Sequence, residues 1–325
     1  MILMQDVSKP FTTTNNGSIP WVDLTYTGGP LKTQATACIG GKNNDMICGF
    51  SNFSDYSVAN QSFVNQFDTN KQQWINITSV GNVPTNRYAI SCANFDNGLI
   101  TIFSGMFNSS SINDLWIFNT LTLTWSLSNV PNAPSPMFGY SSLLLIDCSV
   151  YNTKSDTWTN MSISGPTPSV RRSFSTVLTS DGRTIIFGGY NTEIFGDLWI
   201  LDITIFQWSM GKILNPIVNL TLGGHTAALV DNYMFVSFGR FDNFNYSSRI
   251  LMLDVSRKDS YKWVTEFTPN TTTTTTVATS SSNTSFDSKN TSIIIGAIIG
   301  SIISFIIFVI ASILTLKFID KTCNI

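Results

Sequence analysis

Histidine and charged side chains are scarce in this chain of 325 residues. It has one histidine, charged residues make up 12% of it, and its formal net charge is −2. Because nucleic-acid binding needs a basic surface, this composition argues against a nucleic-acid partner. The sequence also lacks a P-loop, a dinucleotide-binding fingerprint, a Gly-x-Ser-x-Gly elbow and any His/Cys/Asp cluster at metal spacing. We therefore predict no catalytic residue, no cofactor and no metal site.

Cysteine is also sparse. The five cysteines are too few and too irregularly spaced for a disulfide framework or a zinc site. Cys38 and Cys48 could meet across a hairpin and form a bridge in an oxidising compartment. The alternative, which the sequence favours, is that both are small buried residues in strands.

The N-terminus lacks the apolar region of about 7–15 residues that marks a signal peptide. Instead, residues 5–8 and Trp21 mirror residues 253–256 and Trp263, so the chain starts at the third strand of a repeat. Either strands from both termini complete the last sheet, or the sequence is clipped at its N-terminus. We favour clipping, because the unit that ends at Trp263 already has its own first two strands.

The most regular stretch of the sequence, residues 171–208, predicts four short antiparallel strands. Ser173–Thr179 alternates apolar and polar residues, and Asp181-Gly182 suits the tight turn of a hairpin. Thr184–Phe187 is β-branched and aromatic, as second strands are, and ends at Gly188-Gly189. Two further strands follow, the first around Trp199 and the second around Trp208. One such sheet cannot bury its faces alone.

The same layout recurs 83 or 84 residues earlier, where NDLWIFNTLTLTW matches GDLWILDITIFQW. An interval of six residues from Asp or Asn to Trp recurs at Asp68/Trp74, Asn119/Trp125, Asn152/Trp158 and Asp202/Trp208. Four strands per unit of about 50 residues are typical of propeller blades. A β-sandwich would explain the alternation but not the repeated spacing.

These units resemble the kelch repeat, which has a glycine pair after strand two, an aromatic on strand three and a tryptophan on strand four. The resemblance implies an all-β, kelch-type β-propeller of four-stranded blades. The residues that carry it are Gly188, Gly189, Trp199, Asp202, Trp208, Trp116, Trp125, Trp74, Trp158 and Trp263.

The units are not equally regular. Leu31–Thr78 and Pro84–Leu127 are complete, and Gly223–Phe267 ends the series. Pro136–Trp158 is about 14 residues short and lacks a glycine pair, so this blade is expected to be incomplete. Residues 1–267 thus predict about five blades and a leading half.

The resemblance extends to the central domain of galactose oxidase, whose copper site uses two histidines, two tyrosines and a cysteine cross-linked to one tyrosine. With His225 as its single histidine, this chain cannot assemble that site. We expect His225 to be structural. Arg87, Arg171 and Arg172 lie just before strand one in their units, and we expect them to be loop or inter-blade partners rather than ligand contacts.

The C-terminal part predicts a membrane anchor. Residues 268–292 are rich in Ser and Thr and are expected to form a disordered, O-glycosylated stalk. Ile293–Leu316 has 24 uncharged residues, enough for a helix that crosses a bilayer of about 30 Å. Lys317 and Lys321 then place the short tail, residues 317–325, in the cytoplasm.

Eleven Asn-x-Ser/Thr sequons precede the predicted helix and favour a propeller outside the cell. They are Asn16, Asn52, Asn60, Asn76, Asn108, Asn160, Asn219, Asn245, Asn270, Asn283 and Asn290. The predicted location is therefore the plasma membrane, with one span and an extracellular head. A tail-anchored protein with a cytosolic propeller is the alternative.

The predicted function is non-enzymatic recognition of a protein or a glycan through loops on one propeller face, because rigid blades hold variable loops. Phe241, Phe244 and Tyr246 in one loop are the candidate ligand contacts, with inter-blade packing as their alternative role. Two other functions stay open: a cytosolic scaffold, and a galactose-oxidase-like enzyme whose ligands lie in missing sequence.

Overall fold

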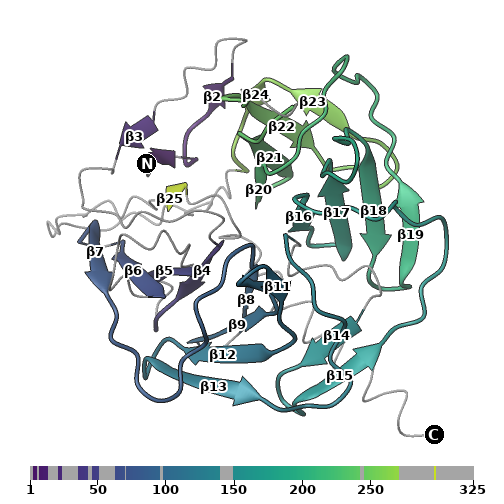
Figure 1. Ribbon diagram of the computed structural model, residues 1–325. Helices are drawn as coiled ribbons and strands as arrows, with labels where there is room; N and C mark the ends of the chain where they lie inside the picture. The colour runs from purple at the N-terminus through teal and green to yellow at the C-terminus, as the bar shows by residue number, and fades with distance from the viewer. Residues whose placement is uncertain are drawn as a thin grey trace, which may run out of the picture.

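The structure, a computed structural model, describes residues 3–5, 7–13, 21–23, 36–42, 46–50, 63–69, 71–95, 98–139, 149–241, 245–270 and 296–297. Every named element in these residues is a strand. The strands form antiparallel sheets arranged as a ring around one axis (Figure 1). The molecule is therefore an all-β propeller, as predicted.

Four blades have four strands each, and the first strand of each lies nearest the axis (Figure 1). Blade 1 consists of β4 (Thr36–Gly40), β5 (Met46–Phe50), β6 (Val64–Asp68) and β7 (Gln73–Asn76). Blade 2 consists of β8 (Cys92–Asn94), β9 (Leu99–Phe103), β12 (Leu115–Asn119) and β13 (Thr124–Ser128). A small hairpin, β10 (Met106–Phe107) with β11 (Ser110–Ser111), extends the loop between its second and third strands.

Blades 4 and 5 repeat this order. Blade 4 consists of β16 (Ser175–Leu178), β17 (Arg183–Phe187), β18 (Leu198–Asp202) and β19 (Gln207–Met210). Blade 5 consists of β20 (Thr226–Val230), β21 (Tyr233–Ser237), β22 (Ile250–Asp254) and β23 (Lys262–Val264). Between blades 2 and 4, blade 3 has β14 (Ser149–Asn152) and β15 (Thr157–Asn160), while residues 140–148 lie outside the described residues.

The repeated interval between Asp or Asn and Trp has a local cause. Asp202 Oδ1 accepts a hydrogen bond of 2.9 Å from the Thr204 amide, which closes the turn between strands three and four. Asn119 and Asn152 make the equivalent turns in blades 2 and 3. The chain then returns so that Leu201 lies opposite Trp208, which is buried. The six-residue interval therefore corresponds to a turn closed by the Asp or Asn side chain, followed by a tryptophan that packs against the preceding strand.

Apolar side chains from neighbouring blades form shared cores. One cluster combines Val177 and Phe187 of blade 4 with Met234 and Leu253 of blade 5, all almost fully buried. Blades therefore bury their faces against each other rather than within one sheet, which is why a single unit is not stable alone.

The N-terminal strands form the predicted half-unit. β1 (Leu3–Gln5) pairs with β3 (Trp21–Asp23) so that Gln5 lies opposite Trp21, as Leu253 lies opposite Trp263 in blade 5. β2 (Phe11–Thr12) pairs with β24 (Glu266–Phe267), which follows β23. The N-terminal segment thus contacts the end of blade 5 without entering its four-stranded sheet.

Most of the predicted membrane anchor lies outside the described residues. Gly296–Ala297 is described as strand β25, which pairs with β1. Residues 271–295, which hold most of the stalk, and residues 298–325 are not among those described. None of the described ranges contains a helix long and apolar enough to span a membrane.

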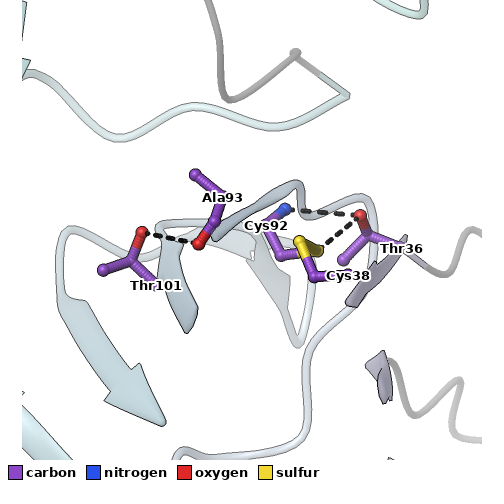
Figure 2. The surroundings of a disulfide bond; sticks show 5 residues. All are labelled: Thr36, Cys38, Cys92, Ala93 and Thr101. Carbon is purple, nitrogen blue, oxygen red and sulfur yellow. Dashed lines mark hydrogen bonds between the residues drawn. A yellow bond between two sulfur atoms is a disulfide. The ribbon is translucent and has the colours of Figure 1, made fainter. Parts of the chain in front are cut away.

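Cys38 and Cys48 both lie in strands, as the favoured interpretation of the sequence had it, but Cys38 is not a free thiol and its disulfide partner is not Cys48. Cys38 of β4 lies opposite Cys48 in the register of blade 1, but it forms a disulfide with Cys92 of β8 in blade 2 (Figure 2). The Cα atoms are 6.2 Å apart, and Thr36 Oγ1 accepts a hydrogen bond of 3.3 Å from the Cys92 amide. The bridge is possible because the innermost strands of adjacent blades meet near the axis.

Candidate functional site

Blades 2 to 5 are joined at one end by a chain of backbone hydrogen bonds. Ala89, Gly139, Ser173 and Gly224 take the same place before strand one, and all have left-handed φ angles of 54°, 61°, 54° and 66°. The Gly139 amide donates to the Ala89 carbonyl (2.8 Å), Ser173 to Gly139 (2.5 Å) and Gly224 to Ser173 (2.7 Å). The same short turn therefore recurs around the axis and holds neighbouring blades in register.

The residues that directly precede these turns form a surface that we call the inner rim. It comprises Tyr88, Phe138, Arg172 and Gly223, together with the residues that bridge to them after strand two, Met106, Tyr190 and Arg240. Arg172 and Tyr190 exchange backbone hydrogen bonds of 2.9 and 2.8 Å, and Gly223 and Arg240 exchange two of 2.9 Å. The rim backbone is thus fixed, while its side chains differ from blade to blade.

Arg171, next to the rim, is buried, and its guanidinium is hydrogen-bonded within blade 4. Its guanidinium contacts both carboxylate oxygens of Asp197, at 2.5 and 3.0 Å, and the Gly188 carbonyl at 3.1 Å. Asp197 also accepts a hydrogen bond of 2.7 Å from the Trp199 indole. Burial alone would raise the pKa of Asp197, but hydrogen bonds from Arg171 and Trp199 outweigh it and lower that pKa.

Arg87 of blade 2 makes the same network. It binds both oxygens of Asp114 and the Ser104 carbonyl, and Asp114 accepts a 2.8 Å hydrogen bond from the Trp116 indole. Both arginines therefore lock strand one to the loop after strand two within their own blade. Both therefore take the loop-partner role, one of the two roles expected for them, rather than the inter-blade role.

Arg172 differs from its neighbour in exposure and in hydrogen bonding, although both contact aromatic rings. Its side chain is exposed, and its Cζ lies 5.4 Å from the Phe138 ring centroid of blade 3 and 5.3 Å from that of Tyr190. Arg240 of blade 5 lies 4.9 Å from the same Tyr190 ring. Within the described residues, neither guanidinium forms an ion pair or a hydrogen bond. Two cations of the rim thus contact aromatic rings and have no acidic partner in the part of the chain that the structure describes.

The candidate ligand loop lies directly beside Arg240. Tyr246 bridges to Arg240, and the Phe241 amide donates to the Asn245 carbonyl at 3.2 Å, so the base of the loop is closed as a hairpin. The side chains of Phe241 and Tyr246 are 47% and 78% exposed, and therefore do not pack between blades. Phe244, the third predicted contact, lies outside the described residues.

His225 is buried and does not reach the rim surface. An added Cβ on Gly188 would lie 3.1 Å from the His225 ring, and one on Gly239 would lie 2.7 Å from the His225 Cβ, so the two glycines make room for the ring and for the backbone of His225. Burial lowers the pKa of His225 to about 4, although backbone groups of Phe187 and Leu222 nearby favour the charged form. A histidine that stays neutral in the core is structural, as expected.

The tryptophans that carry the kelch resemblance pack in the blades. Trp116, Trp125, Trp199, Trp208 and Trp263 are buried, and Trp74 and Trp158 are half-buried. Gly188 and Gly189 have φ angles of 62° and 107°, as the turn after β17 requires.

Five predicted glycosylation sites have exposed side chains: Asn108, Asn160, Asn219, Asn245 and Asn270. Asn76 lies in β7, and the remaining five sequons fall outside the described residues. Surface position is what an acceptor asparagine requires, and whether any of them carries a glycan stays a prediction.

A second arginine network, which sequence reasoning missed, lies at the opposite end of the blades. Arg183 of blade 4 binds Asp181, the Val255 carbonyl (2.8 Å) and the Tyr261 hydroxyl (3.0 Å) of blade 5. Burial would raise the pKa of Asp181, but Arg183 and Thr179 lower it by hydrogen bonding. Asp181 therefore holds the side chain of Arg183, which joins blades 4 and 5.

No group of three or more metal-binding side chains occurs in the described part of the chain. The site with features beyond structural support is thus the inner rim of blades 3 to 5 and the loop beside it. It offers exposed aromatic and cationic groups on a fixed backbone, which suits recognition of a ligand.

Comparison with known proteins supports this architecture. The model of the Attractin/LZTR1 beta-propeller family matches residues 137–302. Host cell factor homolog hcf-1 of Caenorhabditis elegans is 24% identical over 215 residues, which cover 53% of this chain and 27% of that protein. Acyl-CoA-binding domain-containing protein 4 of Arabidopsis thaliana is 25% identical over 181 residues, with 50% and 27% covered. The chain thus spans about a quarter of the length of these curated relatives.

The solved structure of YjhT has the same fold. It aligns with a TM-score of 0.54 at 14% sequence identity, and covers 72% of this chain and 84% of the YjhT chain. At this identity the likeness concerns the fold alone.

Proposed function

The chain belongs to the Attractin/LZTR1 β-propeller family of kelch type, and from that premise we propose that it is a non-enzymatic recognition module at the cell surface. The propeller fold suggests an interaction module, and the inner rim with its adjoining loop is the proposed contact surface. Its ligand would be a protein, with a glycan as the alternative.

The observation that carries this proposal is the exposure of Phe241 and Tyr246 on a closed hairpin next to Arg240. Large aromatic side chains and arginine dominate the energetics of binding surfaces, because they contribute contact area with little loss of conformational freedom. The hairpin and the rim turns fix the backbone beneath them, so little ordering is needed on binding.

Three observations support an extracellular head. The Cys38–Cys92 disulfide suits an oxidising compartment. Five sequons have exposed asparagines. The Ser/Thr-rich residues 268–292 and the apolar residues 293–316 follow the propeller, in the order of a stalk and an anchor. A cytosolic, tail-anchored scaffold would have neither the disulfide nor the glycans.

The location is tested by gel mobility of the native, full-length protein with and without an enzyme that removes N-glycans. A large downward shift is expected, together with digestion of the propeller by protease added to intact cells. Protein from cells grown with an inhibitor of N-glycosylation is the control and should show no shift. An unshifted, protease-protected native protein would contradict the proposal and leave the cytosolic scaffold as the function.

The contact surface is tested on living cells by proximity labelling around the full-length protein. Changing Phe241 and Tyr246 together to serine should remove specific partners from the labelled set. Ile205 is 63% exposed in the turn after β18, at the opposite end of blade 4, so Ile205→Ser is the matched control and should leave the set intact. Loss of the same partners with Ile205→Ser and not with the loop variant would place binding elsewhere.

A further inference from the structure

We infer that the inner rim binds an acidic peptide segment of a partner protein, with Arg172 and Arg240 each holding one carboxylate. This inference rests on the proposed recognition function and specifies its ligand chemistry. The two arginines come from adjacent blades and meet over one aromatic ring, that of Tyr190.

The comparison between Arg171 and Arg172 is the first argument. Arg171 is buried, and its donors are used by Asp197, Gly188 and Ser169. Arg172 is exposed and has no hydrogen-bond acceptor for its guanidinium among the described residues. A guanidinium has five N–H donors. Those of Arg171 are used within blade 4, whereas those of Arg172 have no acceptor among the described residues. Free donors on a fixed backbone are what a ligand can use.

The stacking geometry is the second argument. Rings of Phe138 and Tyr190 flank Arg172, and Tyr190 also carries Arg240. Aromatic rings interact with the faces of a guanidinium, whereas its N–H donors lie along the edges. Stacking therefore orients both arginines without consuming their donors. Each keeps an edge for the two oxygens of a carboxylate, the geometry in which arginine binds this group best.

The spacing of the two cations fits two acidic side chains of one peptide. Both guanidiniums lie about 5 Å from one ring centroid, at 5.3 and 4.9 Å, so they cannot be farther apart than these two distances combined. In an extended peptide, alternate side chains lie on one side about 7 Å apart. Acidic residues at alternate positions can thus reach both arginines.

Local charge is the third argument. The whole chain is slightly acidic, with a formal net charge of −2, so the paired arginines stand out from the rest of the protein. Glu193 lies in the loop that starts at Tyr190, but no ion pair joins it to Arg172 or Arg240 in the described residues. The aromatic side chains of Phe241 and Tyr246 lie next to Arg240 and can cover apolar residues that flank the acidic ones.

The test uses the purified full-length protein in detergent micelles and a fluorescein-labelled peptide of alternating glutamate and glycine. Fluorescence anisotropy is expected to show saturable binding that weakens as salt is raised, and none with the matched glutamine–glycine peptide. Arg172→Gln and Arg240→Gln should each weaken binding about tenfold, since each removes a charge-assisted pair. Arg257→Gln is the control, because Arg257 is exposed in the turn after β22, at the opposite end of blade 5.

Tyr190 provides a second readout. Tyr190→Ala should weaken peptide binding by a similar factor, because both guanidiniums lose their common ring, whereas Tyr190→Phe keeps the ring and should bind as the parent protein does. Equal losses for the two variants would show that stacking does not position the arginines.

Two outcomes would overturn the inference while the proposed function stands. The first is binding of a heparin hexasaccharide in preference to the peptide, which would assign the rim to sulfated glycans. The second is no peptide binding by a protein whose partners on living cells still depend on Phe241 and Tyr246. If Arg257→Gln weakened peptide binding as much as the rim variants do, the effect would come from overall charge, and the inference would also be overturned.

Discussion

Two adjacent arginines show how much one position along a strand matters. Arg171 points into blade 4 and is neutralised by Asp197, while Arg172 lies on the rim between two aromatic rings. The first removes charge from a buried region, where an unpaired guanidinium would destabilise the fold. The second leaves a positive charge at the surface. In the sequence they are simply a pair of arginines, and only their partners separate the structural role from the proposed binding role.

His225 is a second residue whose surroundings determine its chemistry. It takes the position of Phe174 in blade 4, directly after the left-handed residue, and packs edge-to-face on Phe187 with ring centroids 5.6 Å apart. A histidine in an aromatic position is compatible with folding only while it is neutral. Burial achieves this by lowering its pKa to about 4.

We predict that this histidine makes the propeller less stable in acid. The unfolded chain takes up a proton near its usual pKa of about 6.5, and the folded protein only near 4, so the free energy of unfolding falls as pH decreases through this range. At pH 5 the loss attributable to His225 is about 2 kcal/mol relative to pH 7.5. His225→Phe, the residue of blade 4, should remove this part of the pH dependence.

The measurement is urea unfolding of the full-length protein at pH 7.5 and pH 5, followed by tryptophan fluorescence. Asp197 and Asp181, whose pKa values are lowered, add a loss of stability only below about pH 4, so they do not obscure the comparison. His225→Asn serves as a second neutral variant in case the larger ring strains the core. The same difference between the two pH values in the parent and both variants would contradict the prediction.

At the scale of elements, strands and turns could be predicted because their signals are local. Asp181-Gly182 gives the expected hairpin, with φ of 83° at Gly182, and alternation gives β16 and β17 close to their predicted bounds. The Asp-to-Trp interval gives the turn before β19. Each feature depends on residues within a few positions of one another, so one sequence carries enough information.

Features that join distant segments could not be predicted in the same way. The Cys38–Cys92 bridge spans 54 residues, and Arg171 reaches Asp197 26 residues away. For the arginine a usable signal was present, because Arg before strand one and Asp before Leu-Trp recur together in two units. For the disulfide there was none, since only the ring brings the first strands of neighbouring blades together.

Glycine at position 188 is required by close approach as well as by backbone conformation. A Cβ added there would lie 2.3 Å from the Leu222 carbonyl oxygen, which belongs to the connection into blade 5. We predict that Gly188→Ala destabilises the propeller by about 2–4 kcal/mol, because the left-handed φ of 62° adds to the steric overlap.

Gly224 provides a matched control for this change. Its φ of 66° is nearly the same, but an added Cβ would meet nothing within 4 Å. Gly224→Ala should therefore cost only about 1–2 kcal/mol, the penalty of the backbone conformation. Thermal unfolding of both variants beside the parent separates the two effects, and equal losses would show that the contact with Leu222 is not limiting.

At the scale of the whole molecule, the ring is held by different devices at different places. Rim hydrogen bonds connect blades 2 to 5, the Arg183 network joins blades 4 and 5, and the β2–β24 pair ties the N-terminal segment to the end of blade 5. The Cys38–Cys92 disulfide cross-links blade 1 to blade 2. Each of these contacts joins segments that are far apart in the sequence.

We therefore predict that the disulfide contributes strongly to the stability of the ring. Closing a loop of 54 residues restricts the unfolded chain enough to stabilise the fold by up to about 4 kcal/mol. Cys38→Ser, Cys92→Ser and the double variant should all lower the free energy of unfolding by the same amount, and a reducing agent should destabilise the parent but none of the variants. Urea unfolding measures the loss, and peptide mapping without reduction identifies the bridge.

A parent protein whose unfolding midpoint does not respond to reduction, or a mapped bridge between Cys38 and Cys48, would contradict this account. A midpoint that does not respond to reduction would also remove the main structural support for an oxidising compartment. An equal loss of stability in all three variants would instead show that the ring needs its disulfide, and so needs to fold where disulfides form.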